Sequence, residues 1–103
     1  MSDKNDELFE VRLSATFRDW LDGIADDVAA AAVAERLLRM RRGLFGDHAS
    51  IGDKVSELRI HYGAGYRAYF TLRGRQVVIL LVGGTKRTQA RDILRAKAMA
   101  QQL

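Results

Sequence analysis

The chain lacks cysteine and any long apolar run. None of its 103 residues is cysteine, which excludes a disulfide framework and a thiolate zinc site. No apolar stretch approaches the ~20 residues that a membrane-spanning helix requires. The first ten residues, MSDKNDELFE, are too acidic and polar for a signal peptide. We therefore expect one cytoplasmic domain spanning residues 1–103, without a membrane segment, in which residues 1–7 form a flexible tail.

Motifs for common cofactor and catalytic sites are also missing. The sequence contains neither the phosphate-binding loop GxxxxGK[ST] nor the dinucleotide fingerprint GxGxxG. The two histidines, His48 and His61, are too few and too isolated for a convincing metal site. Spacing alone assembles no Ser-His-Asp set. We expect no cofactor and no metal.

Charge is distributed unevenly along the chain. Residues 1–35 carry nine acids against three bases, whereas residues 36–103 carry 14 bases against four acids. Such asymmetry favours an anionic partner that meets the C-terminal two-thirds of the protein. The alternative is a solvated surface that happens to be basic, and the charge pattern alone does not decide between the two.

Residues 56–87 predict three consecutive strands joined by two tight turns. Apolar and polar residues alternate over 58–62 and again over 66–71, the period of a strand with one buried face. Glycines between these segments suit short hairpin loops. Residues 77–82 are apolar at every position, which predicts a strand buried on both faces at the centre of the sheet.

The segment before these strands predicts one more strand and two helices. Residues 8–13 alternate as a first strand, and Ser14 or Thr16 can cap the helix that follows. Apolar residues at helical spacing mark that helix over 17–24. A second helix begins at residue 26 and runs to about residue 42. We expect the two helices to form an antiparallel hairpin on one face of the sheet.

The connections complete the expected fold. Residues 43–55 are expected to form a glycine-rich loop that delivers His48 and Lys54 to the sheet. The triplet 83–85, Gly-Gly-Thr, is expected to break the last strand, with Thr88 capping a C-terminal helix. The order β-α-α-β-β-β-α predicts an α+β domain, in which a helical hairpin and the C-terminal helix pack against a mainly antiparallel sheet.

Basic residues gather near the polar face of this sheet: Lys54, Arg59, Arg67, Lys86 and Arg87. Cations that converge on one concavity hold a phosphodiester and stabilise the extra negative charge of its pentacoordinate transition state. RNA brings its own nucleophile, the 2′-hydroxyl. A metal-free ribonuclease therefore needs only a base, phosphate clamps and a group that helps the leaving 5′-oxygen.

Each of these residues also has a purely structural interpretation, as solvated decoration of the sheet. For Arg67, which is flanked by apolar strand positions, we favour function, and for Arg59 the two interpretations are level. His61 is an acid or base, or else a hydrogen-bonded surface residue. Tyr69 either stacks on a base or covers the sheet.

Three stretches together carry a family resemblance: FRDWLDGI, ELRIHYGAGYRAYF and VVILLVGGTKRTQARDI. They resemble the RelE/HigB/ParE superfamily of toxins from type II toxin–antitoxin modules. The chain is most similar to the addiction-module killer proteins, also called phage-derived Gp49-like HigB toxins. The resemblance covers residues 8–103 and implies a β-α-α-β-β-β-α domain that is neutralised by a tightly bound antitoxin.

The resemblance also implies an activity and a set of site residues. RelE and HigB members cut mRNA on the ribosome, without metal, by means of clustered basic residues. Arg67 matches the strand arginine that contacts the scissile phosphate in such members, and Lys86 and Arg87 lie where they carry another phosphate-contacting base. We expect Arg67 and Lys86 to be catalytic. RNA contacts are expected from Lys54, Arg59, Arg87, His61 and Tyr69.

One departure from the family pattern concerns the proton donor. Ribosome-dependent relatives usually place a Tyr or His early in the last helix or just before it. Residues 88–93, TQARDI, contain neither, so the general acid is unassigned.

The resemblance leaves the target open. ParE members of the same fold poison DNA gyrase without catalysis, and fold alone does not decide the activity. We expect an mRNA endoribonuclease that inhibits translation, with a gyrase poison or a catalytically inactive antitoxin-binding module as alternatives. The antitoxin in this subgroup is typically a small helix-turn-helix repressor, similar to HigA. Operator DNA would then be bound only through that partner.

Overall fold

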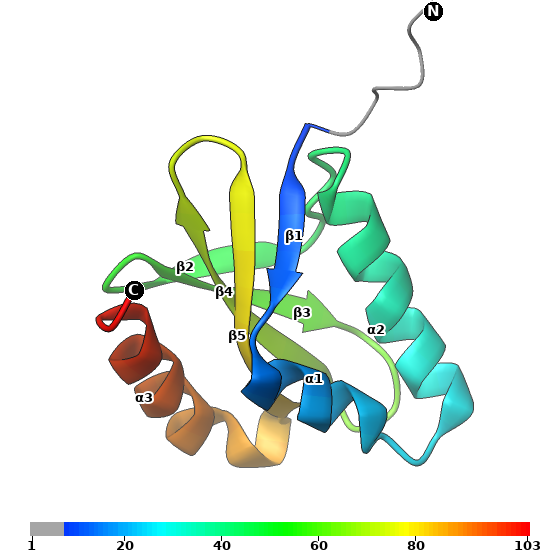
Figure 1. Cartoon of the computed structure of the whole chain (residues 1–103). Helices are drawn as coiled ribbons and strands as arrows, with labels where there is room; N and C mark the ends of the chain where they lie inside the picture. The colour runs from blue at the N-terminus through cyan, green and yellow to red at the C-terminus, as the bar shows by residue number, and fades with distance from the viewer. Residues whose placement is uncertain (1–7) are drawn as a thin grey trace, which may run out of the picture.

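The computed structural model describes residues 8–103, so the tail expected over residues 1–7 lies outside the described residues. Figure 1 shows the strands and helices of these residues along the chain. In order they are β1 (Glu10–Leu13), α1 (Ala15–Asp22), α2 (Asp27–Met40), β2 (His48–Gly52), β3 (Val55–Ile60), β4 (Tyr66–Arg73), β5 (Val77–Thr85), the 3₁₀ turn η2 (Lys86–Thr88) and α3 (Gln89–Ala100).

The strands form one sheet in the order β1-β5-β4-β3-β2. β1 runs parallel to β5, and every other neighbouring pair is antiparallel. The predicted α+β class is therefore confirmed, with β5 inside the sheet as its unbroken apolar run indicated. Both hairpin loops between β3 and β5 contain glycines at positive φ, for example 54° at Gly63 and 63° at Gly74.

The loop prediction for residues 43–55 was wrong in part. His48–Gly52 is strand β2, which pairs antiparallel with β3 and adds a fourth consecutive strand to the predicted order. Asp53 and Lys54 make the turn between them with φ of 55° and 66°. The segment HASIG has little strand propensity of its own. Backbone hydrogen bonds to β3 hold this segment as a strand, although its side chains do not predict one.

The expected break at residues 83–85 was also wrong, because β5 continues through Thr85. A Cβ at Gly83 would lie 2.1 Å from the Trp20 ring, and one at Gly84 would lie 1.9 Å from Asp92 Oδ2. Neither distance is sterically possible. The two glycines therefore let helices approach the strand closely from both faces and do not end it.

Side-chain caps begin α1 and α2 but not α3. Ser14 caps α1 by accepting a hydrogen bond from the Phe17 N–H at 2.9 Å. Thr88 makes no such cap for α3; its hydroxyl donates to Asp92 instead. Among the described residues, the structure contains no helix that is both long and apolar enough to cross a membrane.

The two faces of the sheet are covered by different helices (Figure 1). α1 and α2 bury an apolar cluster against one face, with Phe17, Val33 and Leu80 fully inside it. α3 covers the other face above Tyr69, Leu81 and their neighbours. Alternation along β3, β4 and β5 assigns successive side chains to the two faces, so each face is a separate half of the core.

Candidate functional site

An open hollow of about 370 Å³ lies at the end of the sheet where β3 turns into β4. It is lined by residues 59–67 and by Lys86. These residues include the polar ends of two strands, the short loop between them and the first residue after β5. Predicted site residues from two separate stretches of sequence thus meet at one concave surface.

Strand register sets the positions of the cations in this hollow. Arg59 of β3 pairs across the ladder with Arg67 of β4, and Arg67 pairs in turn with Gly84 of β5. Lys86 follows two residues later, and its N–H donates to the Gly65 carbonyl oxygen at 3.0 Å. A Cβ at Gly65 would lie 3.0 Å from Lys86 Cδ, so this glycine leaves room for the lysine stem beside the loop.

The buried carboxylate of Glu57 holds the side chains of Arg59 and Arg67 in place. Its side chain is only 2% exposed, and Oε1 accepts hydrogen bonds from Arg59 Nε at 3.0 Å and from an Arg67 terminal nitrogen at 3.1 Å. Oε2 accepts from the Tyr69 hydroxyl at 3.0 Å and from Gln89 Nε2 at 2.7 Å. One buried acid therefore joins side chains of β3, β4 and α3.

These contacts keep Glu57 ionised despite its burial. Burial alone would raise its pKa, but the hydrogen bonds from Arg59, Gln89 and Tyr69 and the charge of Arg67 lower the pKa below its ordinary value. Burial, and then the neighbouring Glu57 charge, raises the pKa of Tyr69, which keeps its proton as the donor. The arrangement holds the Arg67 guanidinium in place, with 13% of its side chain exposed.

A second carboxylate lies at the rim of the hollow. Asp47 Oδ2 lies 2.6 Å from Nε2 of His61, and Asp47 Oδ1 lies 3.4 Å from an Arg59 terminal nitrogen. The hydrogen bond with His61 lowers the pKa of Asp47. Burial opposes this effect, and the charge of Arg59 lowers the pKa further. The His61 side chain remains 74% exposed.

Comparison with known proteins matches this chain to one family. The family described as "Phage derived protein Gp49-like" matches over residues 19–102, which is most of the chain. The chain belongs to the Gp49-like family. This is a family of HigB/RelE-like toxins, as the resemblance predicted, and membership implies an antitoxin partner. The chain is also 42% identical over 94 residues to an uncharacterized protein of Haemophilus influenzae, covering 91% of this chain and 95% of that protein.

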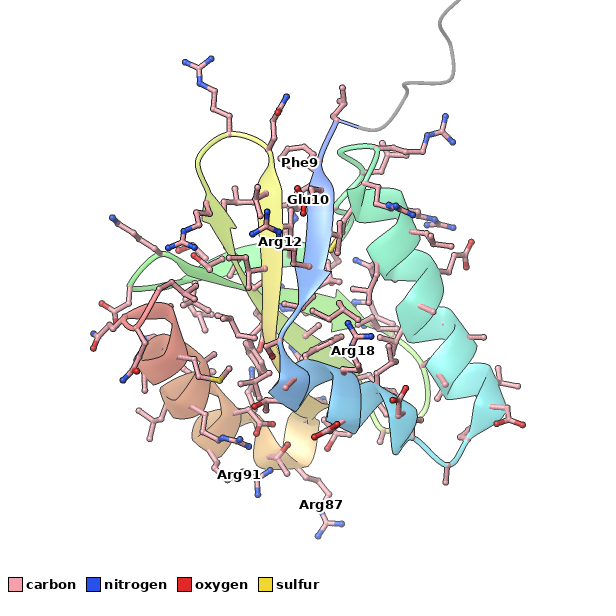
Figure 2. All side chains as sticks on the ribbon, viewed as in Figure 1. Phe9, Glu10, Arg12, Arg18, Arg87 and Arg91 are labelled. Carbon is pink, nitrogen blue, oxygen red and sulfur yellow. The ribbon has the colours of Figure 1, made fainter. Side chains whose placement is uncertain are left out.

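The predicted site residues of this Gp49-like protein are not all brought together. Arg59, His61, Arg67 and Lys86 line the hollow. Arg87 is exposed on the neighbouring turn η2 but lies outside the lining, and Figure 2 shows its side chain extending away from the fold. These residues give one concave group of four with one basic neighbour.

Two residues expected to contact RNA lie away from the hollow. Lys54 lies at the opposite end of β3 from Arg59, roughly 16 Å away along an extended strand. It lines a different concavity, together with Arg73 and Leu103. Tyr69 is fully buried under α3, so its ring has no face on which a base can stack. The alternation of Tyr69 with apolar residues predicts an exposed side chain, but α3 covers that face of the sheet.

The sequence reasoning missed the acids and the amide that organise the cations. Glu57 and Arg59 are two residues apart on one strand, so their side chains lie on the same face. That spacing was the available signal in the sequence for their ion pair. Asp47 meets His61 across 14 positions of sequence, and Gln89 meets Glu57 across 32. No local pattern indicates contacts of that separation. His48, which was expected to reach the sheet, is the first residue of β2, and its ring packs against Phe45.

Proposed function

We propose that this Gp49-like toxin is a ribosome-dependent, metal-independent endoribonuclease that cuts mRNA and so inhibits translation. The observation that carries the proposal is the placement of Arg67 and Lys86 on one hollow, with Arg67 fixed by buried Glu57. Preorganised cations of this kind lower the barrier of reactions in which negative charge develops. The family membership supports the toxin role that the proposal refines.

The reaction needs little beyond positioning and charge. The 2′-hydroxyl of RNA attacks the adjacent phosphorus, and the bond to the 5′-oxygen breaks, giving a 2′,3′-cyclic phosphate and a 5′-hydroxyl. Arg67 and Lys86 donate hydrogen bonds to the phosphoryl oxygens, whose negative charge grows in the transition state. A guanidinium held at a fixed angle by Glu57 loses little entropy when it engages the phosphate.

The remaining cations position the RNA strand. Arg59 lies one strand from Arg67 and is 35% exposed, so it reaches a neighbouring phosphate while keeping its bond to Glu57. Arg87 extends the basic surface beyond the hollow. Lys54 has no part in this cluster. We assign the antitoxin as a small helix-turn-helix repressor of the HigA kind, through which alone the complex binds operator DNA.

The proposal is tested by mapping transcript ends in cells that express the protein. We expect wild type to arrest growth and to produce new mRNA 5′ ends, and Arg67→Ala to produce neither. Arg67→Ala leaves Glu57 with three hydrogen-bond donors, so the variant should fold. Arg73→Ala is the matched control, because Arg73 is an exposed arginine at the other end of the same strand.

The outcomes separate the candidate targets. New 5′ ends in wild type and Arg73→Ala but not in Arg67→Ala support the endoribonuclease. Intact transcripts together with stalled replication would overturn it in favour of a gyrase poison. Intact transcripts and normal growth, with the antitoxin still bound, would leave a catalytically inactive module.

A further inference from the structure

The proposed cleavage leaves one proton unassigned. When the bond from phosphorus to the 5′-oxygen breaks, the leaving alkoxide requires a proton, and a positioned acid contributes roughly 10²–10⁴-fold to such a step. The start of α3 offers no histidine or tyrosine, since residues 88–93 read TQARDI. His61 is the histidine that lines the hollow.

We propose that His61 donates this proton and that Asp47 orients its imidazole. The inference rests on the proposed endoribonuclease function and names its general acid. His61 follows the last residue of β3, two positions after Arg59, and lines the hollow together with Arg67 and Lys86. A protonated imidazole there meets the phosphate that Arg67 and Lys86 hold.

Asp47 is itself fixed in position. Its carbonyl oxygen accepts a hydrogen bond from the Arg59 N–H at 3.0 Å and another from the Arg36 guanidinium at 3.4 Å. Arg36 also donates to the Phe45 carbonyl oxygen at 2.9 Å and to the Arg59 carbonyl oxygen at 2.6 Å. The segment that carries Asp47 is thereby tied to both α2 and β3. With its main chain held in this way, Asp47 directs its carboxylate to Arg59 and to the imidazole of His61, which restricts the His61 ring.

The hydrogen bond also assigns the two ring nitrogens of His61. Asp47, as a carboxylate, only accepts, so the hydrogen between them belongs to Nε2 of His61. Nδ1 is then the nitrogen that exchanges a proton with the substrate. After donation the imidazole is neutral and keeps its Nε2–H bond to Asp47, so the orientation of the ring survives the step.

The proton balance closes within this scheme. The 2′-hydroxyl loses its proton to water, which enters the open hollow, and the new bond from 2′-oxygen to phosphorus replaces the bond to the 5′-oxygen. His61 Nδ1 gives its proton to that 5′-oxygen. Several charged and titratable groups face His61. They are Asp47, which lies just before β2, and the lining residues Arg59, Tyr62, Tyr66, Arg67 and Lys86.

A leaving-group substitution tests this role directly. A ribosome-bound mRNA that carries sulfur in place of the bridging 5′-oxygen has a leaving group that needs no proton. With ordinary RNA, His61→Ala should cut about 10²–10⁴-fold more slowly than wild type. With the sulfur substrate the same variant should retain near wild-type rates. His48→Ala, which removes the other histidine, should leave both rates unchanged.

Asp47→Asn should give the same signature at smaller size, because Asp47 acts through His61. Its loss on ordinary RNA should be about tenfold, again restored by the sulfur substrate. An equal loss on both substrates would show that His61 only binds RNA, and no loss on either would remove it from the reaction; both results overturn the inference. Failure of the wild-type protein to cut either RNA would instead overturn the endoribonuclease itself.

Discussion

The two faces of the sheet are built on different principles. The face under α1 and α2 is an apolar cluster, in which Phe17, Val33 and Leu58 are fully buried. The face under α3 also buries apolar residues, but it contains two carboxylates, Glu57 and Asp92, each at most 2% exposed. One face stabilises the protein by packing, and the other combines packing with paired charge. The basic hollow is attached to the second face through Glu57.

Buried charge is tolerated on the α3 face because each polar atom has a partner. Glu57 has four donors, and Asp92 accepts from Thr88 and from its neighbour Arg91. Among the described residues, no buried side-chain nitrogen or oxygen lacks a hydrogen-bond partner. Removing one partner from such a network costs more free energy than removing both. The α3 face is therefore the one more sensitive to single polar substitutions.

The largest expected loss of stability comes from the apolar face. Phe17→Ala removes a fully buried ring between α1 and the sheet, and should lower the free energy of unfolding by about 3–5 kcal/mol. Urea unfolding at several pH values measures this, and the loss should be the same at each pH. A loss that varies strongly with pH would contradict the division between the two faces.

A smaller loss is expected from the charged face. Glu57→Gln removes the anion shared by Arg59 and Arg67, and should lower the free energy of unfolding by about 1.5–3 kcal/mol near neutral pH. Glu35→Gln is the matched control, because Glu35 forms an exposed pair with Arg39 that contributes at most ~1 kcal/mol. Equal effects of the two substitutions would show that the Glu57 network adds nothing to stability.

The Glu57 contribution should also depend on pH. Because the folded state lowers the pKa of Glu57, its stabilisation is present above the ordinary value of 4.5 and is lost as pH falls through the folded pKa. The difference between wild type and Glu57→Gln should therefore shrink in acid. Denaturant titrations from neutral to acidic pH check this. A difference that stays constant or grows as pH falls would contradict the assigned ionisation.

The smallest expected loss of stability comes from removing one hydroxyl group on the α3 face. Tyr69→Phe removes the hydroxyl that donates to Glu57 and keeps the buried ring. It should lower the free energy of unfolding by about 1 kcal/mol, the usual size for one hydrogen bond. RNA cleavage should persist, because Tyr69 does not reach the hollow. Loss of cleavage in a stably folded Tyr69→Phe protein would support a role of Tyr69 in RNA contact.

Sequence patterns predicted the strands whose own residues carry a strong period. Alternation indicated β3 and β4, and an unbroken apolar run indicated that β5 lies inside the sheet. β2 was missed because its order comes from pairing with β3. Gly83 and Gly84 suggested the end of the strand, although β5 continues through them. Their role depends on Trp20 and Asp92, which pack on them and are too distant in sequence for a local pattern to indicate the contact.

The sequence indicated which residues belong to the candidate site better than it indicated their contacts. Arg59, Arg67 and Lys86 could be proposed because strand alternation and family resemblance both point to them. Whether a polar strand residue is exposed depends on which helix covers that face of the sheet. The strand pattern does not give this information, so Tyr69 was expected on the surface although it is buried. Partners that approach from other elements, as Asp47 does, are set by tertiary structure alone.

The central claim is that the hollow around Arg67 and Lys86 cuts RNA. The most direct measurement is to incubate purified protein with ribosomes programmed with a defined mRNA, and to analyse the RNA ends. We predict cleavage that leaves a 5′-hydroxyl and a 2′,3′-cyclic phosphate for wild type and Arg73→Ala. Removing the charge of Arg67 or Lys86 should slow it by about 10²–10³-fold. Intact mRNA with wild type, or equal cutting by wild type and Arg67→Ala, would contradict the account.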